Sequence, residues 1–435
     1  MYTDLFLLIS MFTTGSFLYP VAKIVEVSTG FPLQSSILLL GGISILYVTV
    51  GGLWAVVVTD VLQFVILTVA VLIVVPLSFD EVGGVSAFLE KVPDGFFSVF
   101  NGEYTVLFII AFTFYNLFFL GGNWSYIQRY TTVKTRKDAK KVGWLFGSLY
   151  VICPVLWMIP PMVYRALNPE LTGLADEGAY LLMCKEVLPT GLLGLMLGGM
   201  IFATASSLNG TLNISAGVFT NDIYKRIFPH TSEVQLMKIA RFSTIGFGIF
   251  AIIIALLIPL MGGIVNVVIS VAALTGVPLY LPIIWTLFSK RQTAFSVKTA
   301  TLVSLGLNAF FKFVTPYAFD FSFTRAEEMA TGVLFPVIIL LLWEVYASWK
   351  NIEDPKHQQC KVIEKQQEMQ APIKATSDNT QSLKVLGYGI AASGALIMAL
   401  GLLNENGRLL VCTLAAILIG IGGFCIYKAK HAKKK

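Results

Sequence analysis

The chain has 435 residues, of which 56% are hydrophobic and 13% are charged. Soluble domains carry about 25% charged residues, so this composition excludes the soluble globular class. The formal net charge is +6, and the basic residues lie in short stretches between apolar runs. That pattern is typical of membrane topology rather than of nucleic-acid binding. We therefore expect a lipid bilayer around the chain and no nucleic-acid partner.

Apolar runs of about twenty residues recur along the chain, and each is long enough to cross a bilayer core as a helix. Residues 64–77 form one continuous apolar run, unlike the alternating strands of a membrane barrel. The sequence predicts an all-α polytopic membrane protein with about twelve transmembrane helices. In chain order they lie at 3–27, 33–50, 53–79, 103–130, 139–166, 190–224, 236–260, 262–289, 297–316, 329–349, 384–403 and 407–428.

Lys and Arg gather in alternate loops between these helices. The positive-inside rule makes those loops cytoplasmic, which places both chain ends in the cytoplasm. We expect the protein in the plasma membrane. The basic stretches are 129–141, 225–241, 290–298, 350–384 and 428–435. Within them, residues 351–382 are rich in Lys, Glu and Gln. We interpret this segment as a cytoplasmic linker between a ten-helix body and two C-terminal helices.

Cysteine and histidine are too scattered for a metal centre. The five cysteines and three histidines form no Cys-x-x-Cys pair and no histidine cluster, so neither a metal site of that kind nor a disulfide framework is expected. The sequence also has no phosphate loop, nucleophile elbow or His-Glu-x-x-His motif. We therefore predict neither an enzyme nor a cofactor.

The segment 202–225 combines an apolar helix with small and hydroxyl-bearing residues. Residues 203, 206 and 207 share one helix face. The backbone carbonyl of Ala203 and the hydroxyls of Ser206 and Ser207 can therefore converge on one point. Three neutral oxygens inside hydrocarbon suit a small hard cation such as sodium. The alternative is close helix packing, with each serine bonded to its own backbone.

Two further predicted spans carry polar residues. Asp60 is an intramembrane carboxylate, which is costly unless it serves as an ion relay or pairing partner; an interfacial position is the alternative. Asn116 precedes a Gly-Gly pair that predicts a helix break facing a cavity. Its amide suits a polar solute, with Phe118 or Phe119 stacked over it. Close helix packing through the glycines is the alternative there.

These motifs together resemble the sodium:solute symporter family. The resemblance rests on Gly-Gly-Leu-Trp-Ala-Val-Val-Val-Thr-Asp-Val-Leu-Gln at 51–63, on Asn116 followed by Gln128 and Arg129, and on the segment 203–225. It implies a LeuT-type inverted-repeat transporter core, with sodium as the coupling ion and a small organic solute as cargo. It further implies the main sodium site at Ala203, Ser206 and Ser207, a sodium exit relay at Asp60, and solute binding at Asn116 and Phe119.

The sequence departs from the family pattern at four positions. Some relatives hold a second sodium ion through two hydroxyls where this chain has Asn209 and Gly210, so we expect one sodium ion. Sugar-transporting relatives carry Lys and Gln where this chain has Tyr150 and Ser270. A galactose-type solute is therefore not expected.

The first span matches the third helix of the family's first repeat, so the two helices before it are missing from this chain. We expect a truncated record of a longer transporter, in which the missing helices would complete the sodium site. The apolar faces of 53–79 and 190–224 are then expected to line an uncovered groove. The chain as given is expected to drive no sodium-coupled uptake by itself.

The sequence thus predicts three parts: a transporter core at 1–349, a cytoplasmic linker at 350–383, and two transmembrane helices with a basic tail at 384–435. The predicted function is sodium-coupled symport of a small polar or charged solute by alternating access. The solute classes are a sugar, an amino acid, a sialic acid or a monocarboxylate. The alternative is a pseudo-transporter or fragment that acts as a membrane sensor or scaffold.

Overall fold

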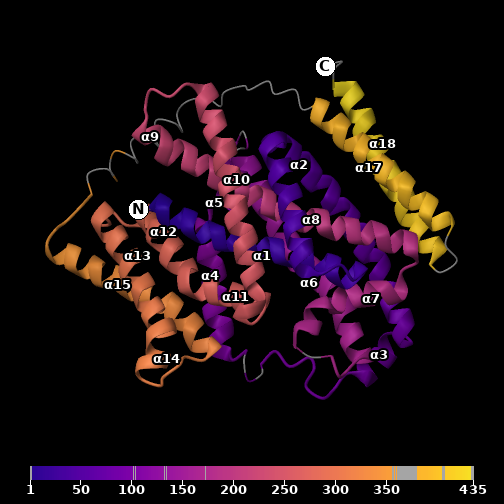
Figure 1. The fold of residues 1–435 in the computed structure, drawn as a ribbon, viewed down its shortest axis with the longest axis horizontal. Coiled ribbons are helices and arrows are strands. Elements are labelled where there is room, and N and C mark those ends of the chain that lie inside the picture. The colour runs from indigo at the N-terminus through magenta and orange to yellow at the C-terminus, as the bar shows by residue number, and fades with distance from the viewer. Residues whose placement is uncertain are drawn as a thin grey trace. The chain divides into compact units, whose positions relative to one another are not determined.

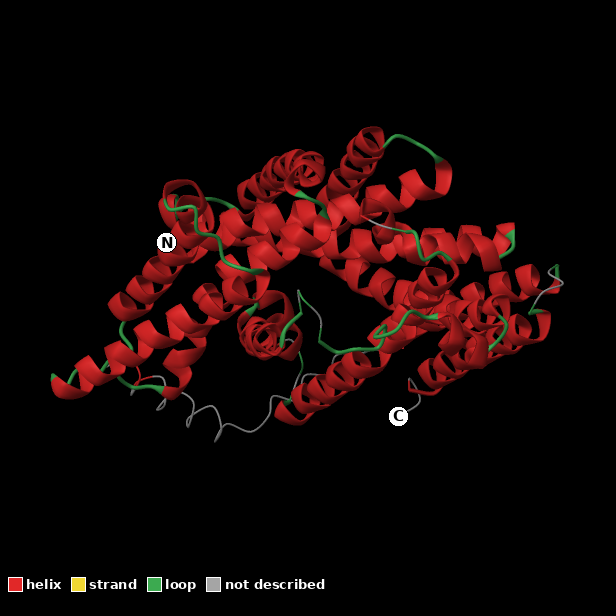
Figure 2. Ribbon diagram, turned by 90° about the horizontal axis from the view of Figure 1, so that it is seen from below, coloured by secondary structure: helices red, strands yellow, loops and turns green. Residues whose placement is uncertain are grey.

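The computed structural model describes residues 2–100, 102, 104–131, 133, 135–171, 173–354, 357, 359, 380–403 and 407–432. Every regular element in this part of the chain is a helix (Figure 2). This confirms the all-helical class. Most of the predicted linker at 350–383 lies outside the described residues, and the three-part division stays a prediction.

The helices follow one another from indigo to yellow in Figure 1. Their bounds are α1 Tyr2–Thr29, α2 Leu33–Val82, α3 Val85–Lys91, α4 Val106–Gly122, α5 Trp124–Thr131, α6 Arg136–Leu167, η1 Gly173–Gly178, α7 Ala179–Val187, α8 Thr190–Val218, η2 Phe219–Tyr224, α9 Lys225–Ile227, α10 Glu233–Leu257, η3 Ile258–Met261, α11 Ile264–Val271, η4 Ala272–Gly276, α12 Val277–Phe288, α13 Ala294–Ala309, η5 Phe310–Val314, α14 Thr315–Ala318, α15 Arg325–Trp349, α17 Thr380–Leu402 and α18 Arg408–Ala432.

Among the described residues, ten helices are long and apolar enough to cross a membrane, or eleven if the bent pair α4–α5 is one span. The predicted count of about twelve is therefore too high. The difference arises in α2, where the spans expected at 33–50 and 53–79 form one continuous helix of 50 residues. The helix continues through the Gly-Gly pair at 51–52, because glycine weakens a helix but keeps its amide donor. A proline would remove that donor, and the proline inside α2 is Pro76, far from this pair.

The chain divides into two compact units. Unit 1 comprises Met1–Ile9, Phe97–Leu145 and Met261–Ala375. Its buried cluster joins α4, η4, α12 and α15 around the fully buried side chains of Met329 and Leu340. Unit 2 comprises Ser10–Phe96, Phe146–Leu260 and Thr376–Lys435, and contains α2, α8 and α10 with the C-terminal helices.

In unit 1, two prolines interrupt the helical ladder of η4 and α12. Proline has no amide hydrogen, so Pro278 and Pro282 leave the carbonyls four residues earlier, those of Leu274 and Pro278, without their helical donors. Helix α13 supplies both bonds. Asn308 Nδ2 donates to the Leu274 carbonyl at 3.1 Å, and Thr301 Oγ1 donates to the Pro278 carbonyl at 3.1 Å. Because Thr301 and Asn308 are two turns apart on α13, one polar face holds the interrupted helix in place.

In unit 2, α17 and α18 form a hairpin (Figure 1), and the two helices pack closely against each other at glycine residues. Gly387, Gly394 and Gly401 recur at seven-residue spacing on α17. A Cβ added at any of them would stand 2.7–2.9 Å from a side chain of α18. Such close backbone approach is how helices associate in lipid, where the hydrophobic effect provides no driving force between them.

The hairpin also packs on α2 and the start of α8. Gly389 of α17 lies against Leu62 of α2, where an added Cβ would come within 2.6 Å of the leucine. One buried cluster joins these helices through Val69, Val71, Ile73, Val74, Leu192, Met196, Ile390, Ile397, Val411 and Ala415. The groove expected along 53–79 and 190–224 is therefore covered over this stretch, because the apolar side of the hairpin occupies it.

Candidate functional site

The polar contact between α2 and α8 joins two of the predicted site residues. The hydroxyl of Ser206 on α8 donates a hydrogen bond to the carboxylate of Asp60 on α2. Both side chains are half-buried. A carboxylate buried at a helix contact needs a donor or a cation beside it. The structure therefore gives Asp60 a pairing partner in Ser206.

Ser206 behaves differently from the threonines of the same helix. Thr204 donates to the Met200 carbonyl at 2.9 Å and Thr211 to the Ser207 carbonyl at 3.0 Å, the usual back-bonding of a hydroxyl four residues along a helix. Ser206 instead donates across to Asp60. The alternative expected from the sequence was a bond from this serine to its own backbone. Ser206 does not form that bond in the structure, because its hydroxyl donates to Asp60.

Ala203 and Ser207 complete the predicted oxygen set on α8. Ala203 is half-buried and Ser207 is exposed. The helix is regular from Thr190 to Val218, so residues 203, 206 and 207 lie on the shared face that the spacing predicts.

Three amide side chains on the same two helices, each with one buried polar atom, were not predicted as site residues. Gln63 lies one turn after Asp60 on α2, and Asn209 and Asn213 lie one and two turns after Ser206 on α8. Each has a buried side-chain atom that forms no hydrogen bond within the described chain: Gln63 Oε1, Asn209 Oδ1 and Asn213 Nδ2. Their helical spacing from Asp60 and Ser206 is the sequence signal that could have identified them.

The composition of this contact limits what it can bind. The described residues contain no group of three or more His, Cys, Asp and Glu side chains placed to hold a metal ion. The contact offers hydroxyl, carbonyl and amide oxygens with the single carboxylate of Asp60. Neutral oxygens with one negative charge suit a monovalent hard cation better than a transition metal, which favours nitrogen and sulfur ligands.

The helix break predicted after Asn116 is present in unit 1. Helix α4 ends at Gly122 and α5 begins at Trp124, and the two axes bend by 56°. Asn123 lies at the break, where its Oδ1 accepts from the Ser125 amide at 2.9 Å. Gly122 permits the close approach of α12, because a Cβ there would stand 2.5 Å from Tyr280 Cβ.

Asn116 and Phe119 lie on α4 just before this break. Phe119 stacks on Tyr115 with ring centroids 5.4 Å apart and meets Tyr126 and Tyr280 edge-on at 5.9 and 5.6 Å. Half-buried Asn116 donates to the Phe112 carbonyl of its own helix at 2.8 Å. The structure thus places Phe119 in an aromatic cluster and leaves the solute role of both residues as a prediction.

The fold defines the class of this protein as a polytopic helical membrane protein. It superposes on a Na+-coupled sialic acid symporter solved in a substrate-bound, outward-open state, with a TM-score of 0.62 and 22% sequence identity. The match covers 78% of this chain and 72% of the symporter. The model of the sodium:solute symporter family matches residues 3–297. The chain belongs to this family, a family of membrane transporters rather than enzymes, as its motifs predicted.

Several curated proteins are similar to this chain. The sodium/glucose cotransporter of Vibrio parahaemolyticus is 29% identical over 376 residues, which cover 78% of this chain and 67% of that protein. Sodium/glucose cotransporter 4 of Danio rerio is 30% identical over 258 residues, or 51% of this chain and 39% of that protein. Sodium/myo-inositol cotransporter 2 of Homo sapiens is 29% identical over 277 residues, or 54% and 41%. The chain thus spans less than half the length of the two vertebrate relatives.

Proposed function

We propose that this protein carries out sodium-coupled symport of a small polar or charged organic solute across the plasma membrane by alternating access. Family membership supports the reaction class. The hydrogen bond from Ser206 to Asp60 is the observation that carries the proposal, because it places a carboxylate beside the face predicted to bind the ion.

The proposed sodium ligands are the Ala203 carbonyl and the hydroxyls of Ser206 and Ser207. A hydroxyl donates one hydrogen bond and keeps lone pairs that accept. Ser206 can therefore direct its proton to Asp60 while its oxygen faces a cation. The Asp60 carboxylate offsets the charge of the ion where the dielectric constant is low. The hydrogen bond between Ser206 and Asp60 supports the proposed role of Asp60 as a relay for the ion on its way to the cytoplasm.

The proposed solute contacts are Asn116 and Phe119 at the end of α4. An interrupted membrane helix offers backbone groups to a polar solute, and the Asn116 amide adds a donor and an acceptor. The similar proteins are named for glucose, myo-inositol and sialic acid. We place the solute of this protein among sugars, polyols, sialic acids, amino acids and monocarboxylates. Galactose remains disfavoured by Tyr150 and Ser270.

Uptake of radiolabelled solutes by cells that express the complete reading frame tests the proposal. We expect at least one of these classes to accumulate when the bath contains sodium and not when it contains choline. Asp60→Asn should weaken the sodium dependence, whereas Asp80→Asn, an exposed carboxylate on the same helix, should leave it unchanged. Equal uptake in sodium and choline for every class would favour the sensor or scaffold function.

A further inference from the structure

The α17–α18 hairpin of unit 2 brings lysines from both of its helices to one end. The helices run antiparallel, so the start of α17 lies beside the end of α18 (Figure 1). A Cβ added at Gly387 would stand 2.8 Å from Ile426 Cγ1. Lys384 lies one turn before this glycine, and Lys428 and Lys430 follow Ile426 within about one turn. These three lysines form what we call the basic surface of the hairpin.

The basic surface lies where two apolar spans end. The stretches long and apolar enough to cross a bilayer run from Leu383 to Leu402 and from Arg408 to His431. A hydrocarbon core that takes up these stretches leaves their ends, and hence the three lysines, at the depth of the lipid headgroups. Lys428 and Lys430 are exposed on either side of Ala429, which is fully buried. Their ammonium groups are therefore accessible beside the packed face of α18.

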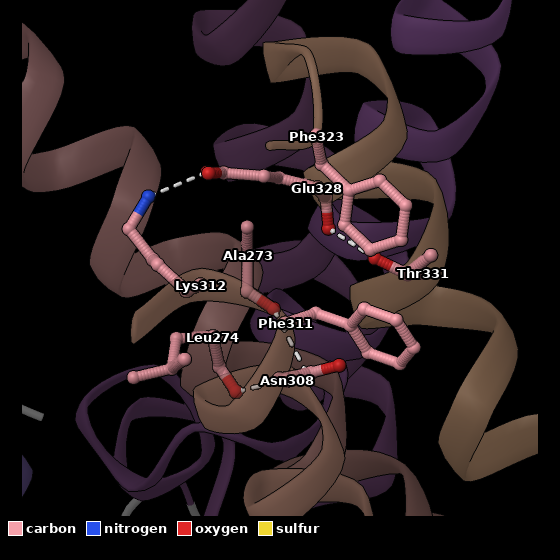
Figure 3. A pocket seen from close by; sticks show the side chains of 8 residues that line it. All are labelled: Ala273, Leu274, Asn308, Phe311, Lys312, Phe323, Glu328 and Thr331. Carbon is pink, nitrogen blue, oxygen red and sulfur yellow. Dashed lines mark hydrogen bonds and ion pairs between the residues drawn. The ribbon is translucent and has the colours of Figure 1, made fainter. Parts of the chain in front are cut away.

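No acidic side chain of the hairpin helices can neutralise this surface. Helices α17 and α18 contain neither Asp nor Glu, and the single acid between residues 380 and 435 is Glu405, in the connection at the other end. None of the three lysines forms an ion pair with the described residues. Lys312 of unit 1, in contrast, contacts Glu328 at 2.6 Å (Figure 3). The basic surface therefore keeps its positive charge uncompensated.

Two tyrosines lie beside the basic surface, one on each helix. Tyr388 follows Lys384 by one turn, and Tyr427 directly precedes Lys428. The two tyrosines are 58% and 60% exposed, and Tyr427 stacks on His431 with ring centroids 4.1 Å apart. Tyrosine is enriched at the membrane–water interface, where its ring lies in the apolar layer and its hydroxyl among the headgroups. The tyrosines thus support the same depth for this end of the hairpin as the lysines do.

We propose that the basic surface binds the headgroups of acidic phospholipids, with its ammonium groups on the lipid phosphates. An anionic leaflet attracts lysines near its surface, and each contributes about a fivefold preference. Phosphatidylcholine also has a phosphate, but its choline cation cancels that charge, so an acidic lipid is preferred. The positive-inside rule assigns this end of the hairpin to the cytoplasmic leaflet. The binding does not depend on the proposed symport.

Titration of the purified full chain with a fluorescent phospholipid tests the proposal. The probes are NBD-labelled phosphatidylglycerol and phosphatidylcholine in detergent, and fluorescence anisotropy reports their binding. We expect the parent to bind phosphatidylglycerol about tenfold or more tightly than phosphatidylcholine, and added NaCl to reduce the difference by screening. Lys384→Gln/Lys428→Gln/Lys430→Gln should lose about tenfold or more of the phosphatidylglycerol affinity and keep that for phosphatidylcholine. The same three lysines changed to arginine should bind as the parent does, because the charge is kept.

Three lysines of α6 provide the matched control. Lys137→Gln/Lys140→Gln/Lys141→Gln removes the same charge from exposed positions, and Asp138 lies among them, 3.1 Å from Lys141. This control should bind phosphatidylglycerol as the parent does. Equal weakening in the control and in the hairpin variant would mean that only the net charge of the protein matters, and would overturn the proposal.

Thermal unfolding in lipid nanodiscs gives a second readout and checks that the variants fold. A lipid that binds the folded protein raises its melting temperature, so the parent should melt higher in phosphatidylglycerol than in phosphatidylcholine nanodiscs. The hairpin glutamine variant should melt like the parent in phosphatidylcholine and gain nothing from phosphatidylglycerol. Equal affinity of the parent for the two lipids, or unchanged phosphatidylglycerol affinity in the hairpin variant, would also overturn the proposal.

Discussion

The Ser206 hydroxyl of α8 donates a hydrogen bond to the Asp60 carboxylate of α2, across 146 positions of sequence. The two residues come from separate motifs, one rich in small residues and the other following a Gly-Gly pair. Their contact brings an expected sodium ligand and an expected relay residue together. It also explains why this hydroxyl, unlike that of Thr204, is directed away from its own backbone.

Gly122 should tolerate no side chain. A Cβ at this position would lie 2.5 Å from Tyr280 Cβ, whereas a Cβ on neighbouring Gly121 would meet Ile284 Cδ1 at 3.5 Å, an ordinary contact. We expect Gly122→Ala to destabilise the protein by about 1–3 kcal/mol, because α4 must move away from α12. Gly121→Ala should melt like the parent. Thermal unfolding in detergent measures both, and equal melting temperatures would contradict the close packing.

The break at Gly122 was predictable, and the continuity of α2 was not. The residues after Asn116 include two glycines and a second asparagine, all poor helix formers, and the structure bends there. The Gly-Gly pair at 51–52 carries a similar local signal, yet α2 runs through it. Glycine lowers helix stability by about 1 kcal/mol per residue, so tertiary packing decides whether a glycine pair ends a helix.

Thr301 should be needed to hold the proline-interrupted helix. Its hydroxyl donates to the Pro278 carbonyl, which Pro282 leaves without a helical donor. We expect Thr301→Val to lower stability by about 1–2 kcal/mol, since a buried acceptor loses its partner. Thr286→Val is the matched control, because that exposed hydroxyl bonds within its own helix. A Thr301→Val protein as stable as the control would show that the Pro278 carbonyl does not need this bond.

The α17–α18 hairpin should depend on its glycine spacing. A Cβ on Gly394 would lie 2.9 Å from Leu418 Cβ and 3.0 Å from the Ile419 amide, whereas one on Gly423 of α18 would meet nothing within 4 Å. Gly394→Leu is therefore expected to separate the helices and Gly423→Leu to be tolerated. Limited proteolysis of the purified protein reports the difference. Equal resistance of both variants would mean that the helices pack in another register.

Asn116→Ala should reduce solute uptake while sodium binding persists. The change removes an amide next to the helix break and leaves the Phe119 aromatic cluster in place. Asn221→Ala is a suitable control, because Asn221 is exposed and donates to a carbonyl four residues earlier, as Asn116 does. Uptake by the complete protein and sodium binding are measured separately. If Asn116→Ala and the parent take up solute alike, the solute pocket lies elsewhere.

Sequence patterns predicted the candidate site through helical spacing but did not predict which residues on other helices contact it. Residues 203, 206 and 207 share a face because a helix repeats every 3.6 residues, which spacing alone predicts. That Ser206 faces Asp60, and that Asn209 is buried without a partner for its oxygen, depends on how α8 packs on α2. The same holds for Asn308, whose donors reach carbonyls more than thirty residues earlier in the chain. Contacts between helices carry no signal in the local pattern of either helix.

Sodium binding to serine variants of the purified protein tests the central claim most directly. ²²Na+ binding in detergent, with choline chloride holding ionic strength constant, reports the candidate site on α8. Loss of one coordinating oxygen should weaken sodium affinity about ten- to a hundredfold in Ser206→Ala and in Ser207→Ala. Thr204→Val, which removes a back-bonded hydroxyl from the same helix, should bind sodium like the parent. Unchanged sodium affinity in both serine variants would contradict the assignment of this site.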